Sequence, residues 1–189
     1  TIGNWAFSDC SNLININIPD SVIDIRAGAF NGCGFSSVEL PYRIINIDNW
    51  AFSHCKSLTS ISIPDGVTDI GQGAFSYSGL TSITIPDSVT NIDSCAFSDC
   101  ASLTTVVLPD SLVKISGGLF SACTSLESIS IPDSVTSIDY GAFSRCNSLK
   151  EIILPNGLKT LGAGVFAYCK NLKTIRIPDS IISIHPYVF

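Results

Sequence analysis

Apolar and polar residues alternate in one short pattern that returns throughout the 189-residue chain. It is seen in "LTSISIP" from Leu58 and in "LKEIILP" from Leu149, where a leucine, two polar residues and then two apolar residues in alternate positions lead up to a proline. Alternation over this length indicates a short β-strand that buries one face. The proline ends the strand because it has no N–H to donate to a neighbouring strand.

The residues after each proline predict the rest of a coil. Asp-Ser usually follows, and it suits a turn whose side chains bond the local backbone. The β-branched "SVTSI" at 134–138 predicts a second short strand, and "GAFSRC" at 141–146 is expected to fold back through a helical or 3₁₀ turn. One repeat is therefore predicted to be one coil with two strands.

Two residue types share the same period, which defines the repeating unit. Intervals of 22 or 23 residues separate Pro19, Pro41, Pro64, Pro86, Pro109, Pro132, Pro155 and Pro178, and similarly Phe7, Phe30, Phe52, Phe75, Phe97, Phe120, Phe143, Phe166 and Phe189. One coil alone buries too little apolar surface to offset the entropy lost when it is ordered. The predicted fold class is therefore a repeat solenoid, in which about eight stacked coils of 22–23 residues form a parallel β-sheet.

The combined pattern is L-x-x-I-x-I-P, then D-S-V-x-x-I, then G-A-F-S-x-C, at a period of 22 or 23 residues. It resembles the BspA-type leucine-rich repeats, also called the Treponema pallidum type, over the whole chain. The resemblance implies a right-handed leucine-rich-repeat superhelix with the L-x-x-I-x-I strands on its concave face and helical or 3₁₀ turns on its convex side. It also implies a protein of a bacterial or protozoal surface that adheres to host proteins or to other cells.

Residues 1–189 are predicted to form a single leucine-rich-repeat domain, and we expect it to be a fragment of a longer repeat protein because the chain starts and stops within a repeat. No apolar stretch approaches the roughly 20 residues that cross a bilayer, so we expect no membrane insertion of this segment. The net charge of -6 argues against nucleic acid as a partner, because binding to a phosphate backbone needs a basic surface.

Seven of the eight cysteines lie three residues after a framework phenylalanine, with Ser78 in the same place in the fourth unit. The period predicts a column of small buried thiols. Disulfides between neighbouring coils and a metal site are the alternatives, but side chains in one column point the same way rather than at each other. Cys95 lies outside the column, and the cysteines show no pair of C-x-x-C motifs typical of a zinc site.

Glycine usually occupies the position two residues before the framework phenylalanine, but Trp5, Trp50, Cys95 and Tyr187 replace it in four places. Because Trp and Tyr are poor in a left-handed conformation, we expect this position to need close packing or a neutral turn rather than a positive φ. Trp5 and Trp50 are either exposed aromatic anchors or partly buried caps over the turn.

Isolated motifs that suggest chemistry have a simpler explanation in the repeat. "GAGVFA" at 162–167 matches a dinucleotide-binding fingerprint, but no helical pattern follows it. The aspartates that follow most prolines offer one carboxylate per coil, which suits turn capping better than calcium binding. His54 and His185 have no partner nucleophile or carboxylate at a recurring position. We expect no cofactor, no metal and no enzymatic activity.

The outward strand positions carry the variation in which a function is expected. Most of them are Ser or Thr in the middle of the chain, whereas the last coils carry charges. Glu127, Lys150 and Lys173 share one column, with Glu151 and Arg176 beside it. These five are the candidate binding residues, because charged groups on a rigid sheet can select and orient a partner. A solvated edge of mixed charge is the alternative.

The leading hypothesis is a non-enzymatic binding and adhesion module of a cell-surface or secreted protein. Its concave sheet is expected to contact a protein or glycan on a host cell, a neighbouring cell or the surrounding matrix. The alternative is a structural spacer or self-associating repeat array, which the nearly identical Ser/Thr faces of the middle coils favour.

Overall fold

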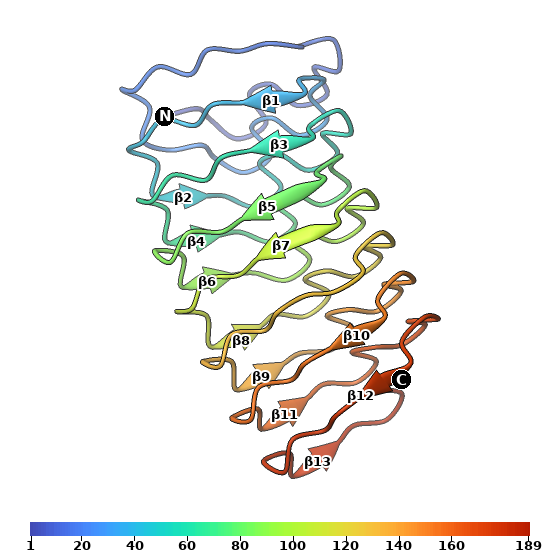
Figure 1. The fold of residues 1–189 in the computed structure, drawn as a ribbon. Coiled ribbons are helices and arrows are strands. Elements are labelled where there is room, and N and C mark those ends of the chain that lie inside the picture. The colour runs from blue at the N-terminus through green and yellow to red at the C-terminus, as the bar shows by residue number, and fades with distance from the viewer.

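The structure is a computed structural model that describes residues 1–189, and it is a solenoid of short parallel strands (Figure 1). The first strand stack contains β1 (Ser37–Val38), β3 (Ser60–Ile61), β5 (Ser82–Thr84), β7 (Thr105–Val107), β10 (Glu151–Ile152) and β12 (Thr174–Ile175). The second strand stack contains β2 (Asn46–Ile47), β4 (Asp69–Ile70), β6 (Asn91–Ile92), β8 (Lys114–Ile115), β9 (Ser137–Ile138), β11 (Thr160–Leu161) and β13 (Ser183–Ile184). The structure contains no helix with the length and hydrophobicity that a membrane crossing requires.

Strand pairing follows the sequence period. Ser37 of β1 lies opposite Ser60 of β3, and Glu151 of β10 lies opposite Thr174 of β12, in parallel register. The second stack forms the ladders β2-β4-β6 and β8-β9-β11-β13. These ladders confirm the predicted parallel solenoid and its second strand after each proline. The first stack holds six strands, so the expected number of about eight coils is slightly too high.

The return turn that contains the framework phenylalanine is neither helical nor 3₁₀, and that part of the prediction is wrong. Alternate N–H groups in this turn donate to the next coil, as in Phe120 N–H to Ala142 O at 2.8 Å and Ala122 N–H to Ser144 O at 2.7 Å. A helix would use these N–H groups within its own coil. Only 6 of the 85 backbone hydrogen bonds lie inside named strands, because most bonds between coils belong to the turns.

The return turns need left-handed residues, contrary to the expectation from Trp and Tyr. Two positions before the framework phenylalanine, φ is 63° at Gly28, 57° at Trp5, 54° at Trp50 and 60° at Cys95. The N–H of this residue points along the solenoid axis and donates to a carbonyl of the next coil. These bonds offset the steric cost that a left-handed backbone has for a residue with a Cβ. A second left-handed position lies two residues after each phenylalanine, at Asp9, Gly32, His54, Tyr77, Asp99, Ala122, Arg145 and Tyr168.

The framework phenylalanines form one continuous stack through the core. Neighbouring rings lie 5.3 to 6.0 Å apart between centroids, with interplanar angles of 7° to 20°. Such offset stacking adds to the free energy gained from burying the rings. The core is therefore a row of apolar side chains along the solenoid rather than a cluster around one centre, and every coil depends on its two neighbours.

The predicted thiol column lies beside this ring stack and is buried except at its two ends, where Cys10 is exposed and Cys169 is partly buried. Cys55 Sγ donates to Phe30 O in the preceding coil at 3.1 Å, and Cys123 Sγ repeats the contact with Phe97 O at 3.1 Å. All eight cysteines are free thiols. Ser78 continues the column, with its Oγ 3.3 Å from Cys100 Sγ. The thiols therefore act as small packed side chains that also bond the neighbouring coil.

The side chains of the Pro-Asp-Ser turn bond the neighbouring coil rather than their own turn. The turn itself closes through a backbone N–H that donates to the proline carbonyl three residues earlier. Ser134 Oγ donates to Leu112 O of the preceding coil at 2.7 Å, and Asp87 accepts the N–H of Asp110 of the next coil at 3.0 Å. The expected local role of these side chains is therefore replaced by a link between coils.

Candidate binding groove

A hollow of about 740 Å³ lies over the C-terminal part of the first strand stack. We call it the C-terminal groove. It is lined by strand residues and by the proline turns that follow them: Asp110, Ser130, Ile131, Pro132, Asp133, Glu151, Ile152, Ile153, Leu154, Pro155, Asn156, Thr174, Ile175, Arg176 and Pro178. Its volume falls within the range of natural small-ligand and peptide pockets.

The floor of the groove is built by the alternation of the strands. Ile152 is buried in the core, whereas Glu151 and Ile153 on either side of it point outward. Ile153 is 80% exposed and pairs with Ser130 of the preceding coil through a parallel bridge. A large apolar side chain is therefore held in solvent at the centre of a polar surface.

The rim of the groove carries more negative than positive charge. Asp110 and Asp133 enter it from successive proline turns, and Glu151 enters it from β10. Arg176 is the only cation in the lining. The groove thus combines three carboxylates, one guanidinium and an apolar centre, which is a set of groups for binding a partner rather than for activating a nucleophile.

The structure brings two of the five candidate binding residues into this groove. Glu151 and Arg176 both line it. Lys150 and Glu127 instead pair with each other outside it, with Nζ 2.6 Å from Oε2 and side chains that are 58% and 63% exposed. Lys173 continues their column through a backbone bond to Lys150 O at 3.3 Å, but it lines a separate hollow beside Phe189. The predicted patch is therefore two adjoining surfaces.

Two features of the groove, Ile153 and Asp133, were not singled out in the sequence. Ile153 and, in the same outward column, Val107 are exposed apolar residues among hydroxyl-bearing ones. Asp133 was interpreted as a turn residue only. The available signal was the apolar residue at an outward strand position, because a strand with one solvated face normally carries polar residues there.

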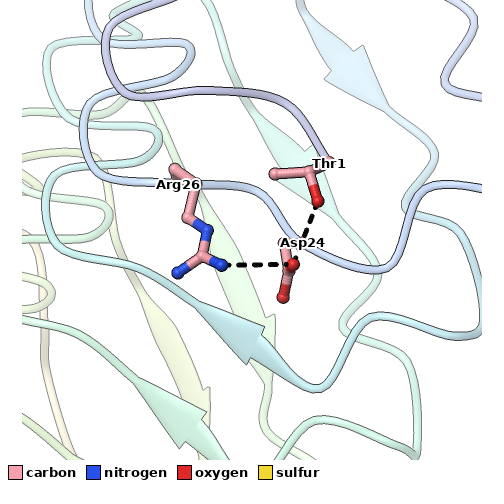
Figure 2. Close-up of polar contacts among 3 residues, drawn as sticks. All are labelled: Thr1, Asp24 and Arg26. Carbon is pink, nitrogen blue, oxygen red and sulfur yellow. Dashed lines mark hydrogen bonds and ion pairs between the residues drawn. The ribbon is translucent and has the colours of Figure 1, made fainter.

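A second hollow, of about 270 Å³, lies on the N-terminal part of the second strand stack. Four aspartates line it together with Arg26: Asp24, Asp48, Asp69 and Asp93. Figure 2 shows that Asp24 Oδ2 is already engaged, since it accepts from Thr1 Oγ1 at 3.1 Å and from Arg26 at 3.3 Å. No group of three or more His, Cys, Asp or Glu side chains has the arrangement of a metal site.

Burial makes the buried thiols poor nucleophiles. It raises the pKa of Cys33 to about 11 and that of Cys55 to about 12, and a backbone hydrogen bond lowers each by a smaller amount. Burial also raises the pKa of Cys95, the thiol outside the column. These thiols stay protonated at neutral pH, and a thiol is far less reactive than a thiolate.

Comparison with known proteins gives a consistent result. The family model for "BspA type Leucine rich repeat region" matches residues 1–100 and 68–189, with six copies of the repeat. A leucine-rich repeat protein from Bacteroides ovatus of known structure is 35% identical, with a TM-score of 0.89, over 95% of this chain and 47% of that chain. This chain thus spans about half the length of that protein.

Two further solved structures show the same fold. The T. pallidum leucine-rich repeat protein is 38% identical, with a TM-score of 0.70, over 72% of this chain and 67% of that chain. A leucine-rich repeat protein from Eubacterium ventriosum is 29% identical, with a TM-score of 0.68, over 79% of this chain and 41% of that chain. No curated protein sequence matches this chain.

Proposed function

This chain belongs to the BspA-type leucine-rich repeat family, and we propose that it is a non-enzymatic binding module of a cell-surface or secreted protein. Its partner is a protein or glycan of a host cell, a neighbouring cell or the surrounding matrix. The contact surface is the first strand stack, with Glu127, Lys150, Glu151, Lys173 and Arg176 at its C-terminal end. Localisation at the surface follows from this proposed role.

The observation that carries the proposal is the exposed Ile153 within the C-terminal groove. An exposed aliphatic side chain beside Glu151 and Arg176 matches the usual composition of an interface, in which an apolar centre is surrounded by polar groups. The strands that hold these residues are paired with those of neighbouring coils and lie on one continuous buried core. Little ordering entropy is therefore lost when a partner binds.

A binding screen against matrix proteins and glycans, followed by two matched variants, tests this proposal. The groove variant replaces Glu151 and Arg176 with Gln and Ile153 with Ser, and the edge variant replaces Lys150 and Lys173 with Gln. Loss of at least about tenfold in affinity in the groove variant, with a smaller effect in the edge variant, supports the groove. Binding that survives both variants, with the fold verified by circular dichroism, overturns the assignment of this surface.

A structural spacer or self-associating array is the second candidate function. One observation favours it: the outward strand positions of the middle coils are nearly all Ser or Thr, which offer little by which a specific partner could be selected. Light scattering distinguishes the two candidates, because stacking of one copy on another gives a mass that rises with concentration, and a binding module stays monomeric.

A further inference from the structure

A third hollow, of about 390 Å³, lies on the return-turn side of the last three complete coils. We call it the basic hollow. It is lined by two positions in each coil, two and four residues after the framework phenylalanine: Ala122, Thr124, Arg145, Asn147, Tyr168 and Lys170. It shares no residue with the C-terminal groove, since its residues precede the strand and the groove includes the proline turn that follows the strand.

The backbone holds this site in a fixed shape. Ala122 and Arg145 are left-handed, with φ of 58° and 62°, and their N–H groups donate to carbonyl oxygens of the next coil at 2.7 and 2.8 Å. Tyr168 has the same conformation, with φ of 62°. Side chains at this position therefore project from equivalent points of successive coils. The backbone that holds them needs no rearrangement when a ligand binds.

The positive charges of the basic hollow have no counterion. The Arg145 guanidinium carbon lies 5.9 Å from the centroid of the Tyr168 ring, a cation–π contact that orients the guanidinium. The three ion pairs of the structure involve Arg26, Lys114 and Lys150, so Arg145 and Lys170 take part in none. No carboxylate lines the hollow. The electrostatic field of the site therefore favours an anion.

We propose that the basic hollow binds the carboxylate of an acidic sugar. Arg145 supplies a planar fork of donors that matches a carboxylate, and Lys170 adds a second positive charge. Asn147 offers both a donor and an acceptor for sugar hydroxyls, and the Thr124 hydroxyl, which donates to Ala101 O at 3.4 Å, keeps its oxygen as an acceptor. The exposed ring of Tyr168 offers an apolar edge to the ring carbons of the sugar.

The charge and size of the site select this class of ligand among anions. The hollow lies at the lower end of the volumes that hold small ligands, which suits one or two sugar rings. A polyanion such as nucleic acid would meet only two cations here, on a chain with a net charge of -6. An acidic peptide would also satisfy the cations, but it offers Asn147 and Thr124 one donor and one acceptor per residue, whereas a sugar ring presents several adjacent hydroxyls that each both donate and accept.

Titration with D-glucuronate, followed by the amide spectra of the isotope-labelled chain, tests this proposal. D-Glucose, inorganic phosphate and a glutamate-rich hexapeptide are titrated in parallel. We expect shifts at residues 122–124, 145–147 and 168–170 with glucuronate, and an affinity for each of the other three probes that is at least about tenfold weaker. Equal binding of glucose removes the role of the carboxylate, and equal binding of phosphate or the peptide removes the role of the sugar. Either result overturns the proposal.

Two variants and one matched control complete the test. Arg145→Gln and Lys170→Gln are each expected to weaken glucuronate binding by about fivefold to tenfold. Gln keeps the Cβ, so the cost of the left-handed backbone at position 145 is unchanged. Lys56→Gln is the control, because Lys56 holds the position of Lys170 in the third coil. An unchanged affinity in both hollow variants overturns the proposal. If a variant fails to fold, the comparison of the four probes on the unaltered chain still decides it.

Discussion

The indole of Trp5 lies directly on Gly28, where an added Cβ would come within 2.1 Å of the ring atom Cε3. Trp5 belongs to the coil before Gly28 and Trp50 to the coil after it, yet the two indoles stack with centroids 6.3 Å apart and an interplanar angle of 21°. Glycine in the intervening coil leaves the space in which the indoles meet. Trp5 and Trp50 are 50% and 38% exposed, so they act as partly buried caps over glycine.

Replacement of Gly28 by Ala is expected to displace Trp5 and separate the indole pair. The left-handed backbone costs about 1 to 2 kcal/mol for any residue with a Cβ, and loss of the aromatic contact adds about 1 kcal/mol. Gly141→Ala is the matched control, since its φ of 60° is similar but the nearest atom to its added Cβ is 3.9 Å away. Tryptophan fluorescence and thermal unfolding measure both effects. If Gly28→Ala and Gly141→Ala destabilise the chain equally and neither changes the tryptophan fluorescence, the contact between the indoles contributes nothing to stability.

Replacement of Ala122 by Gly is expected to stabilise the chain. Ala122 is left-handed, with φ of 58°, and glycine adopts this conformation without the steric cost of a Cβ. The expected gain is about 0.5 to 1 kcal/mol in the free energy of unfolding after the greater flexibility of glycine in the unfolded chain is included. Ala101→Gly, at an exposed position without positive φ, should lose a similar amount. Chemical denaturation of the two variants gives the sign of the change in the free energy of unfolding. A loss of stability in both variants would contradict a steric cost of the Cβ at position 122.

The period predicted those features that depend on one residue type per coil. The paired strands, the phenylalanine stack and the thiol column follow from which positions recur, because recurring positions in stacked coils are neighbours. The left-handed turns could not be predicted in this way, since the hydrogen bonds that stabilise Trp50 in that conformation come from the next coil and not from its own neighbours in sequence. Local propensity argued for the opposite conformation.

The candidate site was predictable in part for the same reason. Glu127 and Lys150 lie one period apart in one column, and the structure pairs them as neighbours. The period does not show which columns share a hollow, because that depends on the directions of side chains across the strand. Glu151 and Arg176 therefore lie with Asp133 and Ile153 in the C-terminal groove, whereas Lys150 and Lys173 lie outside it.

Removal of the ion pair between Lys150 and Glu127 is expected to change stability little. Both side chains are more than half exposed, so water screens the attraction, and exposed pairs contribute about 0.2 to 1 kcal/mol. Lys150→Gln should lower the free energy of unfolding by about 0.5 kcal/mol at low salt and by less at 0.5 M salt, where the Debye length is only a few ångströms. Thermal unfolding of the variant and the parent at both salt concentrations measures this. A loss above about 2 kcal/mol would indicate a structural role for the pair.

The buried thiols are expected to make the chain sensitive to alkaline pH. Burial raises the pKa of Cys55 to about 12 and that of Cys100 to about 11, from an ordinary value of 9.0. Between pH 9 and these values the folded chain retains thiol protons that the unfolded chain releases. The stabilisation is therefore complete below about pH 9 and is lost as pH rises toward the folded pKa, by up to about 1.4 kcal/mol per pH unit for each thiol.

A variant with Ser at positions 55 and 100 isolates this effect, because serine does not titrate in this range and Ser78 already occupies the same column in the fourth coil. The midpoint of thermal unfolding, measured under reducing conditions from pH 7 to pH 10.5, should fall less steeply above pH 9 in the variant than in the parent. Lys and Tyr titrate equally in both chains and cancel in the comparison. Parallel curves above pH 9 would mean that the column does not control the alkaline response, and a steeper fall in the variant would mean that the sulfur atoms stabilise the folded thiolate.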